Sequence, residues 1–149
     1  MTEGSQGRGR QARGGHAAVE IALMAPWIFF LFIGVLDFGF YAYAAIATQN
    51  AARVGAMYTS SSSTLAADRD GACPYILEEL RWLPNVKSAV TVCTALPVNV
   101  TAERVDPGVD GAPASRVAVT YQTIPMIPIP GLMTGRMTLT RVAEMRLKE

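Results

Sequence analysis

An apolar run near the N-terminus constrains the fold of this chain more than any other feature. Of the 27 residues in 21–47, 23 are apolar, and the only charged one is Asp37. A hydrocarbon core needs about 20 such residues in a helix, so we expect a transmembrane span over about residues 21–47. Apart from Pro26 and isolated glycines, no turn signal interrupts residues 16–58. One helix of about 65 Å is therefore predicted there, and a wholly soluble protein is disfavoured.

The charges on the two sides of this run differ. The net charge of the chain is +1, and residues 1–15 carry three arginines against one glutamate. Basic residues before an apolar span favour a cytoplasmic N-terminus, which places the C-terminal part in the periplasm or outside the cell. Residues 1–15 are also rich in glycine, so we expect a disordered leader. Basic and acidic groups nearly balance over residues 48–149, which argues against a nucleic-acid partner.

Small residues line one face of the outer half of the predicted helix. They recur at spacings of three and four, and they are Ala44, Thr48, Ala51, Ala52, Gly55 and Ala56. A stripe of small side chains allows a helix or a sheet to approach closely. Two interpretations are open: the stripe packs against the C-terminal domain of the same chain, or it packs against another subunit.

Residues 59–149 have the pattern of an ordinary small domain. A polar stretch at 60–64 ends the long helix, and Pro74–Leu83 predicts a short amphipathic helix. Alternating apolar residues then predict half-buried antiparallel strands, which lie near residues 86–92, 98–100, 117–121 and 137–147. Prolines at 125, 128 and 130 predict an extended loop before the last strand. The expected fold class is α+β, a long N-terminal transmembrane helix followed by a small antiparallel-sheet head domain with one short helix.

Both cysteines, Cys73 and Cys93, follow the apolar run. In an oxidising compartment a disulfide between them would close a loop of about 20 residues and contribute about 3 kcal/mol. The alternative is a pair of buried free thiols. Two cysteines and one distant histidine are too few ligands for zinc, so we expect no metal site and no cofactor.

A glycine and a glutamate mark the start of the apolar run. Gly15 is followed by His16, and Glu20 is the fifth residue after the glycine. This arrangement resembles the type IV prepilin cleavage motif, in which a membrane-embedded prepilin peptidase cuts after the glycine. The resemblance implies a cut between Gly15 and His16, and pairing of Glu20 with the amino terminus of a neighbouring subunit. A lone carboxylate at the edge of the hydrocarbon is costly. The alternative is a plain membrane anchor with an interfacial glutamate.

A longer stretch resembles the TadE-like family, which comprises pilin-like proteins of tight adherence (Flp-type) pilus systems. The matching features are Val19-Glu20, Ala22-Leu23, Pro26, Gly34, Asp37-Phe38-Gly39 and the run from Gln49 to Ala56; residues 116–147 resemble the C-terminal strands and Pro-rich loop of the family. The resemblance implies a minor pilin or pseudopilin in the bacterial inner membrane that contributes to pilus assembly and adhesion. The implied partners are the prepilin peptidase, other pilin subunits and pilus assembly proteins.

Asp37 is a carboxyl group inside the apolar run. One interpretation is that it contacts another subunit or the assembly machinery. The other is that it lies near the outer interface and reaches the lipid headgroups, because a span of about 20 residues that starts at Ile21 places it in the outer third.

Three other classes of protein remain to be weighed. An ordinary signal peptide would be cut after Ala42-Tyr43-Ala44, but the apolar stretch before that site is longer than a usual signal sequence. A permanently anchored accessory protein of the pilus or secretion machinery would be neither processed nor polymerised. An enzyme is disfavoured, since the one histidine lies in the leader region and no nucleophile has a partner base.

Overall fold

The computed structural model describes residues 11–86, 90–125, 127 and 135–148, with side chains from residue 15 onward. The chain divides into two compact units, Met1–Phe38 and Gly39–Glu149. We call the second the head unit and describe each unit by itself. The first ten residues of the expected leader and most of the expected Pro-rich loop lie outside the described residues.

The described part of the N-terminal unit is a single helix. Helix α1 runs over Gln11–Thr59 and so contributes residues to both units. It begins five residues before the expected start at His16, because glycines such as Gly14 and Gly15 cost a helix about 1 kcal/mol each without blocking it. Pro26 lies inside α1, where its missing N–H leaves one carbonyl without its helical partner.

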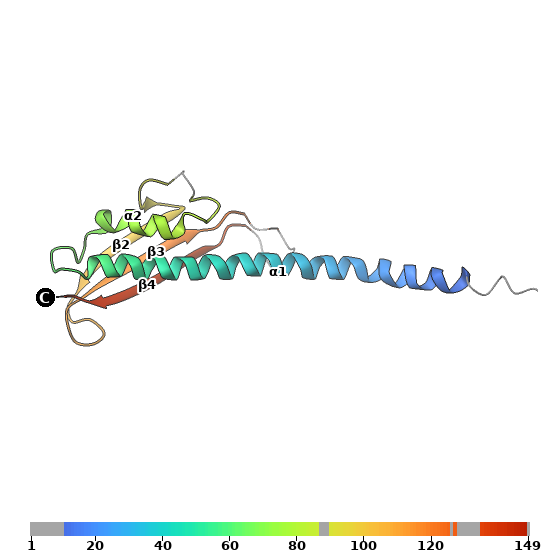
Figure 1. The fold of residues 1–149 in the computed structure, drawn as a ribbon, viewed down its shortest axis with the longest axis horizontal. Coiled ribbons are helices and arrows are strands. Elements are labelled where there is room, and N and C mark those ends of the chain that lie inside the picture. Colours follow the sequence, from blue (N-terminus) through green and yellow to red (C-terminus); the bar gives the residue numbers. More distant parts are fainter. Residues whose placement is uncertain (1–10, 87–89, 126, 128–134, 149) are drawn as a thin grey trace, which may run out of the picture. The chain divides into compact units, whose positions relative to one another are not determined.

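The head unit is an antiparallel sheet with helices packed on one face (Figure 1). Its strands follow one another in space as they do in sequence, and they are β1 (Thr94–Ala95), β2 (Val98–Val105), β3 (Ala114–Gln122) and β4 (Thr138–Arg146). Helix α2 (Arg69–Leu80) and the later part of α1 cover the same face. The expected α+β class, with a long apolar helix before a small antiparallel sheet and one short helix, is confirmed.

One hydrophobic core joins the sheet to both helices. Alternate residues of β3, namely Val117, Val119 and Tyr121, are completely buried, as a strand with one covered face requires. The small residues of α1 are buried in the same core, and they are Ala44, Thr48, Ala51, Ala52, Gly55 and Ala56. The stripe therefore packs against the sheet of its own chain, which is the first of the two interpretations.

Gly55 marks a close approach between α1, α2 and β3. A Cβ atom at this position would lie 2.8 Å from Cδ1 of Ile76 in α2 and 3.1 Å from Cγ1 of Val117 in β3. Four residues further on, Thr59 meets the start of the same strand, since the Ser115 and Thr59 hydroxyl oxygens are 2.6 Å apart. Helix α1 therefore runs antiparallel to β3 across the core.

Helix α2 was expected over Pro74–Leu83 and is observed over Arg69–Leu80, so both its start and its end differ from the expectation. It begins after Asp68, whose Oδ1 accepts a 2.9 Å hydrogen bond from the Gly71 N–H and so caps the helix. Pro74 consequently lies inside the helix and not in its first turn. The same carboxyl accepts a hydrogen bond from Tyr58, which raises the pKa of that phenol.

The strand expected near residues 86–92 does not form at the described residues 86 and 90–92, and residues 87–89 lie outside the described part of the chain. Val86 lies in a turn, and neither Val90 nor Val92 belongs to a strand. The Asn85 side chain holds this turn against the sheet, since its Nδ2 donates to the Gln122 carbonyl at 2.6 Å and its Oδ1 accepts from Tyr121 at 2.7 Å. Burial of Val86 satisfies the apolar pattern without strand pairing.

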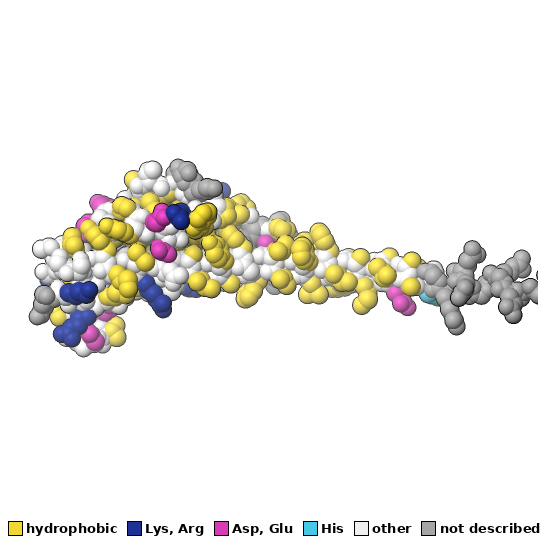
Figure 2. Space-filling model, viewed as in Figure 1, with side chains coloured by type: hydrophobic (Ala, Val, Ile, Leu, Met, Phe, Trp, Pro, Cys, Tyr) yellow, Lys and Arg dark blue, Asp and Glu magenta, His cyan; other side chains and the backbone are white. Residues whose placement is uncertain are grey.

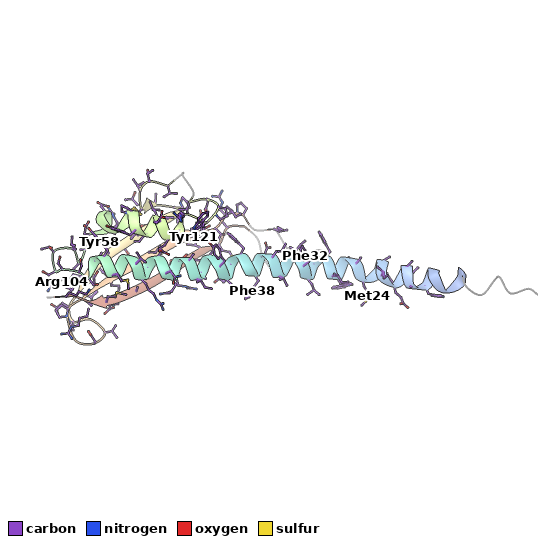
Figure 3. All side chains as sticks on the ribbon, in the orientation of Figure 1. Met24, Phe32, Phe38, Tyr58, Arg104 and Tyr121 are labelled. Atoms are coloured by element: carbon purple, nitrogen blue, oxygen red, sulfur yellow. A yellow bond between two sulfur atoms is a disulfide. The ribbon has the colours of Figure 1, made fainter. Side chains whose placement is uncertain are left out.

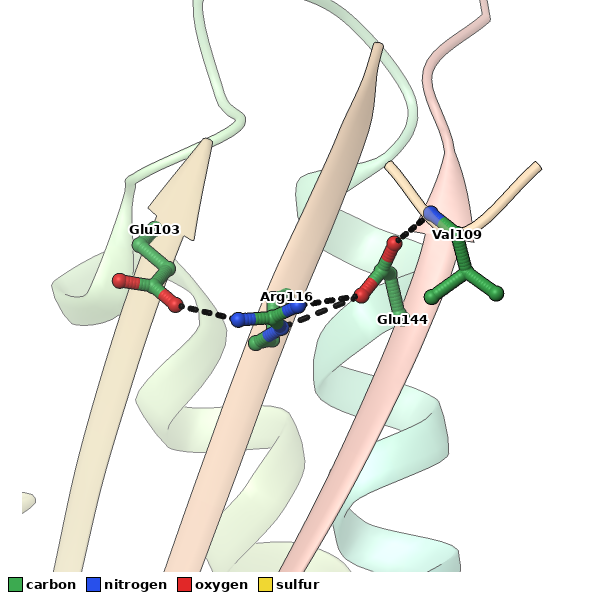
Figure 4. A network of polar contacts seen from close by, with 4 residues as sticks. All are labelled: Glu103, Val109, Arg116 and Glu144. Atoms are coloured by element: carbon green, nitrogen blue, oxygen red, sulfur yellow. Dashed lines mark hydrogen bonds and ion pairs between the residues drawn. The ribbon is translucent and has the colours of Figure 1, made fainter. Parts of the chain in front are cut away.

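The other face of the sheet carries a row of charges (Figure 4). Glu103, Arg116 and Glu144 are register partners on β2, β3 and β4, and Arg116 contacts Glu103 at 3.3 Å and Glu144 at 3.0 Å. Glu144 also accepts a hydrogen bond from the Val109 N–H. That bond, together with the contact to Arg116, lowers the pKa of Glu144.

Candidate membrane-anchoring and assembly site

The apolar part of α1 is a candidate membrane span. Among the described residues one helix is long and apolar enough to cross a membrane, over Gly15–Thr59. Its large side chains are exposed and include Leu23, Trp27, Phe29, Leu31 and Phe32, and Figure 2 shows the hydrophobic side chains following one another along this helix. A continuous apolar surface of this kind marks a site of contact with a membrane or a protein.

The exposed side chains surround the helix and do not form a single stripe. Met24, Phe32 and Phe38 extend outward from α1 (Figure 3), and all three are exposed. A helix that is apolar on all sides is stable only when lipid or protein surrounds it. This segment can therefore be surrounded by lipid in one state and by neighbouring helices in another.

The residues of the cleavage motif lie at the start of this segment. Gly15, His16 and Glu20 are helical and exposed. Within the described residues Glu20 takes part in no ion pair. Five residues along a helix advance by about 7.5 Å and turn by about 140°, so Gly15 and Glu20 lie on different faces. The cut between Gly15 and His16 and the pairing of Glu20 stay predictions.

Asp37 differs from its neighbours in α1. Its side chain is only 7% exposed, whereas Leu36 and Phe38 on either side are exposed. Its Oδ2 atom is buried without a hydrogen-bond partner among the described residues. A buried carboxyl oxygen without a partner costs free energy, so this position favours a hydrogen-bond donor from another molecule.

The two cysteines lie in the head unit. The structure joins Cys73 of α2 to Cys93, which precedes β1, in a disulfide with a Cα–Cα distance of 5.8 Å. Both side chains are buried in the core. The link attaches α2 to the edge of the sheet, where the two-residue strand β1 supplies little pairing of its own. Among the described residues no group of three or more potential metal ligands comes together.

The match with a known family falls on the helix described above. The family model described as TadE-like protein matches residues 15–57. This segment is similar to TadE-like proteins. The resemblance predicted from the N-terminal motifs is confirmed for these residues. No curated protein and no solved structure matches the chain.

One group of exposed side chains was not anticipated as a site. Leu96, Ile124 and Ile127 are apolar and exposed in the loops at one end of the sheet. The sequence contains one indication of this exposure. The isoleucines of the Pro-rich loop recur with neither the period of a strand nor that of a helix. Because neither period assigns these side chains to the core, a surface role could have been considered for them.

Proposed function

We propose that this chain is a minor pilin or pseudopilin of a tight adherence pilus. Residues 16–58 would anchor it in the bacterial inner membrane, with residues 1–15 in the cytoplasm and residues 59–149 in the periplasm. The observation that supports this most strongly is the exposed apolar helix, which carries Glu20 near its start and matches the TadE-like family model over residues 15–57.

The physical basis of assembly is an exchange of surroundings. In the membrane, lipid covers the apolar surface of α1, and in a pilus the same surface would pack against helices of neighbouring subunits. Such packing depends on van der Waals contact, since lipid and leucine are equally apolar. Glu20 would select the register, because a carboxylate in an apolar bundle is stable only opposite a cation. The amine released by a cut before His16 supplies that cation.

The head unit has a separate role in this proposal. Its sheet, helix α2 and the later part of α1 form a disulfide-linked core. The exposed apolar residues in the first part of α1 do not belong to this core. In a minor pilin such a head stays accessible at the pilus surface, where it contributes to assembly and adhesion. TadE-like proteins are not known as enzymes, and we propose no catalytic role.

The first experiment is the intact mass of the protein extracted from membranes that contain its own prepilin peptidase. A chain that begins at His16 supports the proposal. A full-length chain would instead indicate a permanently anchored accessory protein, and a chain that begins at Ala45 a secreted one. G15V should abolish processing, whereas the matched change G14V, one residue earlier, should leave it intact.

The second experiment separates insertion from assembly. E20A should insert normally into the membrane and be processed, yet be lost from sheared pili. E20D keeps the carboxylate and should retain part of the assembly. Unchanged incorporation of E20A into pili would remove Glu20 from the mechanism.

A further inference from the structure

The two ends of the sheet in the head unit differ in how close they lie to Gly39, where α1 enters this unit. Helix α1 enters this unit at Gly39, directly after the exposed apolar residues. Its later residues Gly55 and Thr59 meet Val117 and Ser115 near the beginning of β3. Because α1 runs antiparallel to β3, the far end of β3 at Gln122 faces the entry of α1.

The β1–β2 turn and the two described ends of the β3–β4 connection meet at this end of the sheet. The register pairs Val98 with Tyr121 and Gln122 with Thr138, which brings the β1–β2 turn next to both segments that flank the β3–β4 connection. The Gln122 N–H donates to the Pro97 carbonyl at 2.8 Å. The loops line a hollow of about 260 Å³, with Leu96, Ile124 and Arg136 among its lining residues.

The large side chains exposed at this end are apolar or basic. Leu96 is 51% exposed, Ile127 47% and Ile124 37%, and Arg136 is exposed beside them. None of the described residues in the loops 94–97, 122–125, 127 and 135–137 is acidic. We call Leu96, Ile124, Ile127 and Arg136 the basal surface.

The opposite end of the sheet has a different character. The β2–β3 hairpin carries Asp106 and Asp110, and the ion pairs of Arg116 lie just below it. Its one large apolar side chain exposed at the tip is Val109, at 88%. The acidic side chains Asp106 and Asp110 thus lie at the end of the sheet away from the basal surface.

We propose that the basal surface rests on the same lipid bilayer that holds the apolar helix. This inference depends on the proposed membrane anchoring. The three apolar side chains would enter the boundary between headgroups and acyl chains, and Arg136 would meet lipid phosphates. The course of the chain favours lipid over a protein partner. Phe38 is an exposed residue of the apolar helix, and Ala44, which is buried in the head core, follows it by six residues, about 9 Å of helix. The bilayer is therefore within reach of this end whenever the helix is inserted.

The test measures contact with lipid position by position in the full chain. Single cysteines are introduced by L96C, I124C, V109C or F32C and labelled with a small fluorophore; intact mass confirms that the native disulfide has been kept. The proteins are reconstituted into vesicles of phosphatidylethanolamine and phosphatidylglycerol, with nitroxide lipids as quenchers. V109C is the matched control, an exposed apolar site at the other end of the sheet, and F32C reports insertion of the helix.

We expect quenching at positions 96 and 124 to exceed that at 109 by about twofold or more, since interfacial side chains lie within about 10 Å of the acyl boundary. Equal quenching at 96, 124 and 109 beside strong quenching at 32 would overturn this inference alone and leave a protein partner as the occupant. Absence of quenching at position 32 would overturn the proposed anchoring as well. R136Q should weaken quenching at 124 in vesicles with phosphatidylglycerol but not in purely zwitterionic ones.

Discussion

Replacing Gly55 by alanine tests whether the close packing of α1 on the sheet limits the side chains that the helix can carry. The new Cβ would lie 2.8 Å from Ile76 Cδ1 and 3.1 Å from both Ile76 Cγ1 and Val117 Cγ1. Ile76 and Val117 are completely buried, so they can move only by displacing other core residues. Overpacking of this kind costs about 1–3 kcal/mol.

A second effect of G55A has the opposite sign. Alanine favours a helix over glycine by about 1 kcal/mol, so the expected net loss for G55A is about 1 kcal/mol. The matched control is G39A in the same helix, where a Cβ meets nothing within 4 Å. G39A should gain about 1 kcal/mol from helix propensity alone. The two variants should therefore differ by about 2 kcal/mol, which combines these two estimates.

The assay is thermal unfolding of the full chain in detergent, followed by near-ultraviolet circular dichroism of its aromatic side chains. A head of this size shifts its Tm by about 4 °C per kcal/mol, so about 8 °C should separate G55A from G39A. Adding I76V removes the atom at 2.8 Å. It should cost about 1 kcal/mol beside glycine and almost nothing in the G55A background. Equal stability of G55A and G39A, or no coupling between G55A and I76V, would refute the packing argument.

Three further predictions concern the head unit. Replacing Cys73 and Cys93 by serine should lower its stability by about 3 kcal/mol through the loop of about 20 residues, measured as a fall in Tm that reducing agent reproduces in the native chain but not in the variant. Glu144 has a lowered pKa, so its stabilising contribution is present above the ordinary carboxyl pKa and is lost as pH falls through the lowered value; E144Q should flatten the dependence of Tm on pH in that acidic range, and an unchanged profile would contradict this. Burial raises the pKa of Tyr121 to about 12, so an ultraviolet titration should show fewer tyrosinates near pH 11 than in the unfolded chain, and Y121F should reduce that difference. The same Y121F variant should lose about 1 kcal/mol, because Asn85 is left without its hydroxyl donor.

Some features could be predicted because they depend on short stretches of sequence. As a helix, the apolar run is longer than the hydrocarbon core of a bilayer is thick. A long helix is therefore expected whatever the fold of the rest of the chain. Val98 and Val100 on β2 flank the polar Asn99, and Val117, Val119 and Tyr121 recur at every second position of β3. Both segments form strands. The Gly15, His16 and Glu20 motif was likewise read from local spacing.

Other features could not be predicted because several distant residues compete for them. The valines at 86, 90 and 92 also alternate with polar residues, yet none of these three described residues lies in a strand. Asn85, next to Val86, instead bonds to Gln122 and Tyr121 of β3. The start of α2 depends on which residue caps it. Asp68 caps the helix, so α2 begins at Arg69 and not at Pro74. Local periodicity contains no information about such partners.

The amino-acid sequence alone was sufficient for the apolar helix, the α+β class and the resemblance of residues 15–57 to TadE-like proteins, because each depends on side-chain type and local order. The sequence left two partners possible for the small-residue stripe, the sheet of the same chain and a second subunit, since both need the same close approach. Folding decided it by burying Ala44, Ala51 and Ala56 against the sheet of their own chain. Folding also brought Leu96 of the β1–β2 turn together with Ile124 and Arg136 of the β3–β4 connection at one end of that sheet. This arrangement arises only when the register of antiparallel strands brings distant residues together.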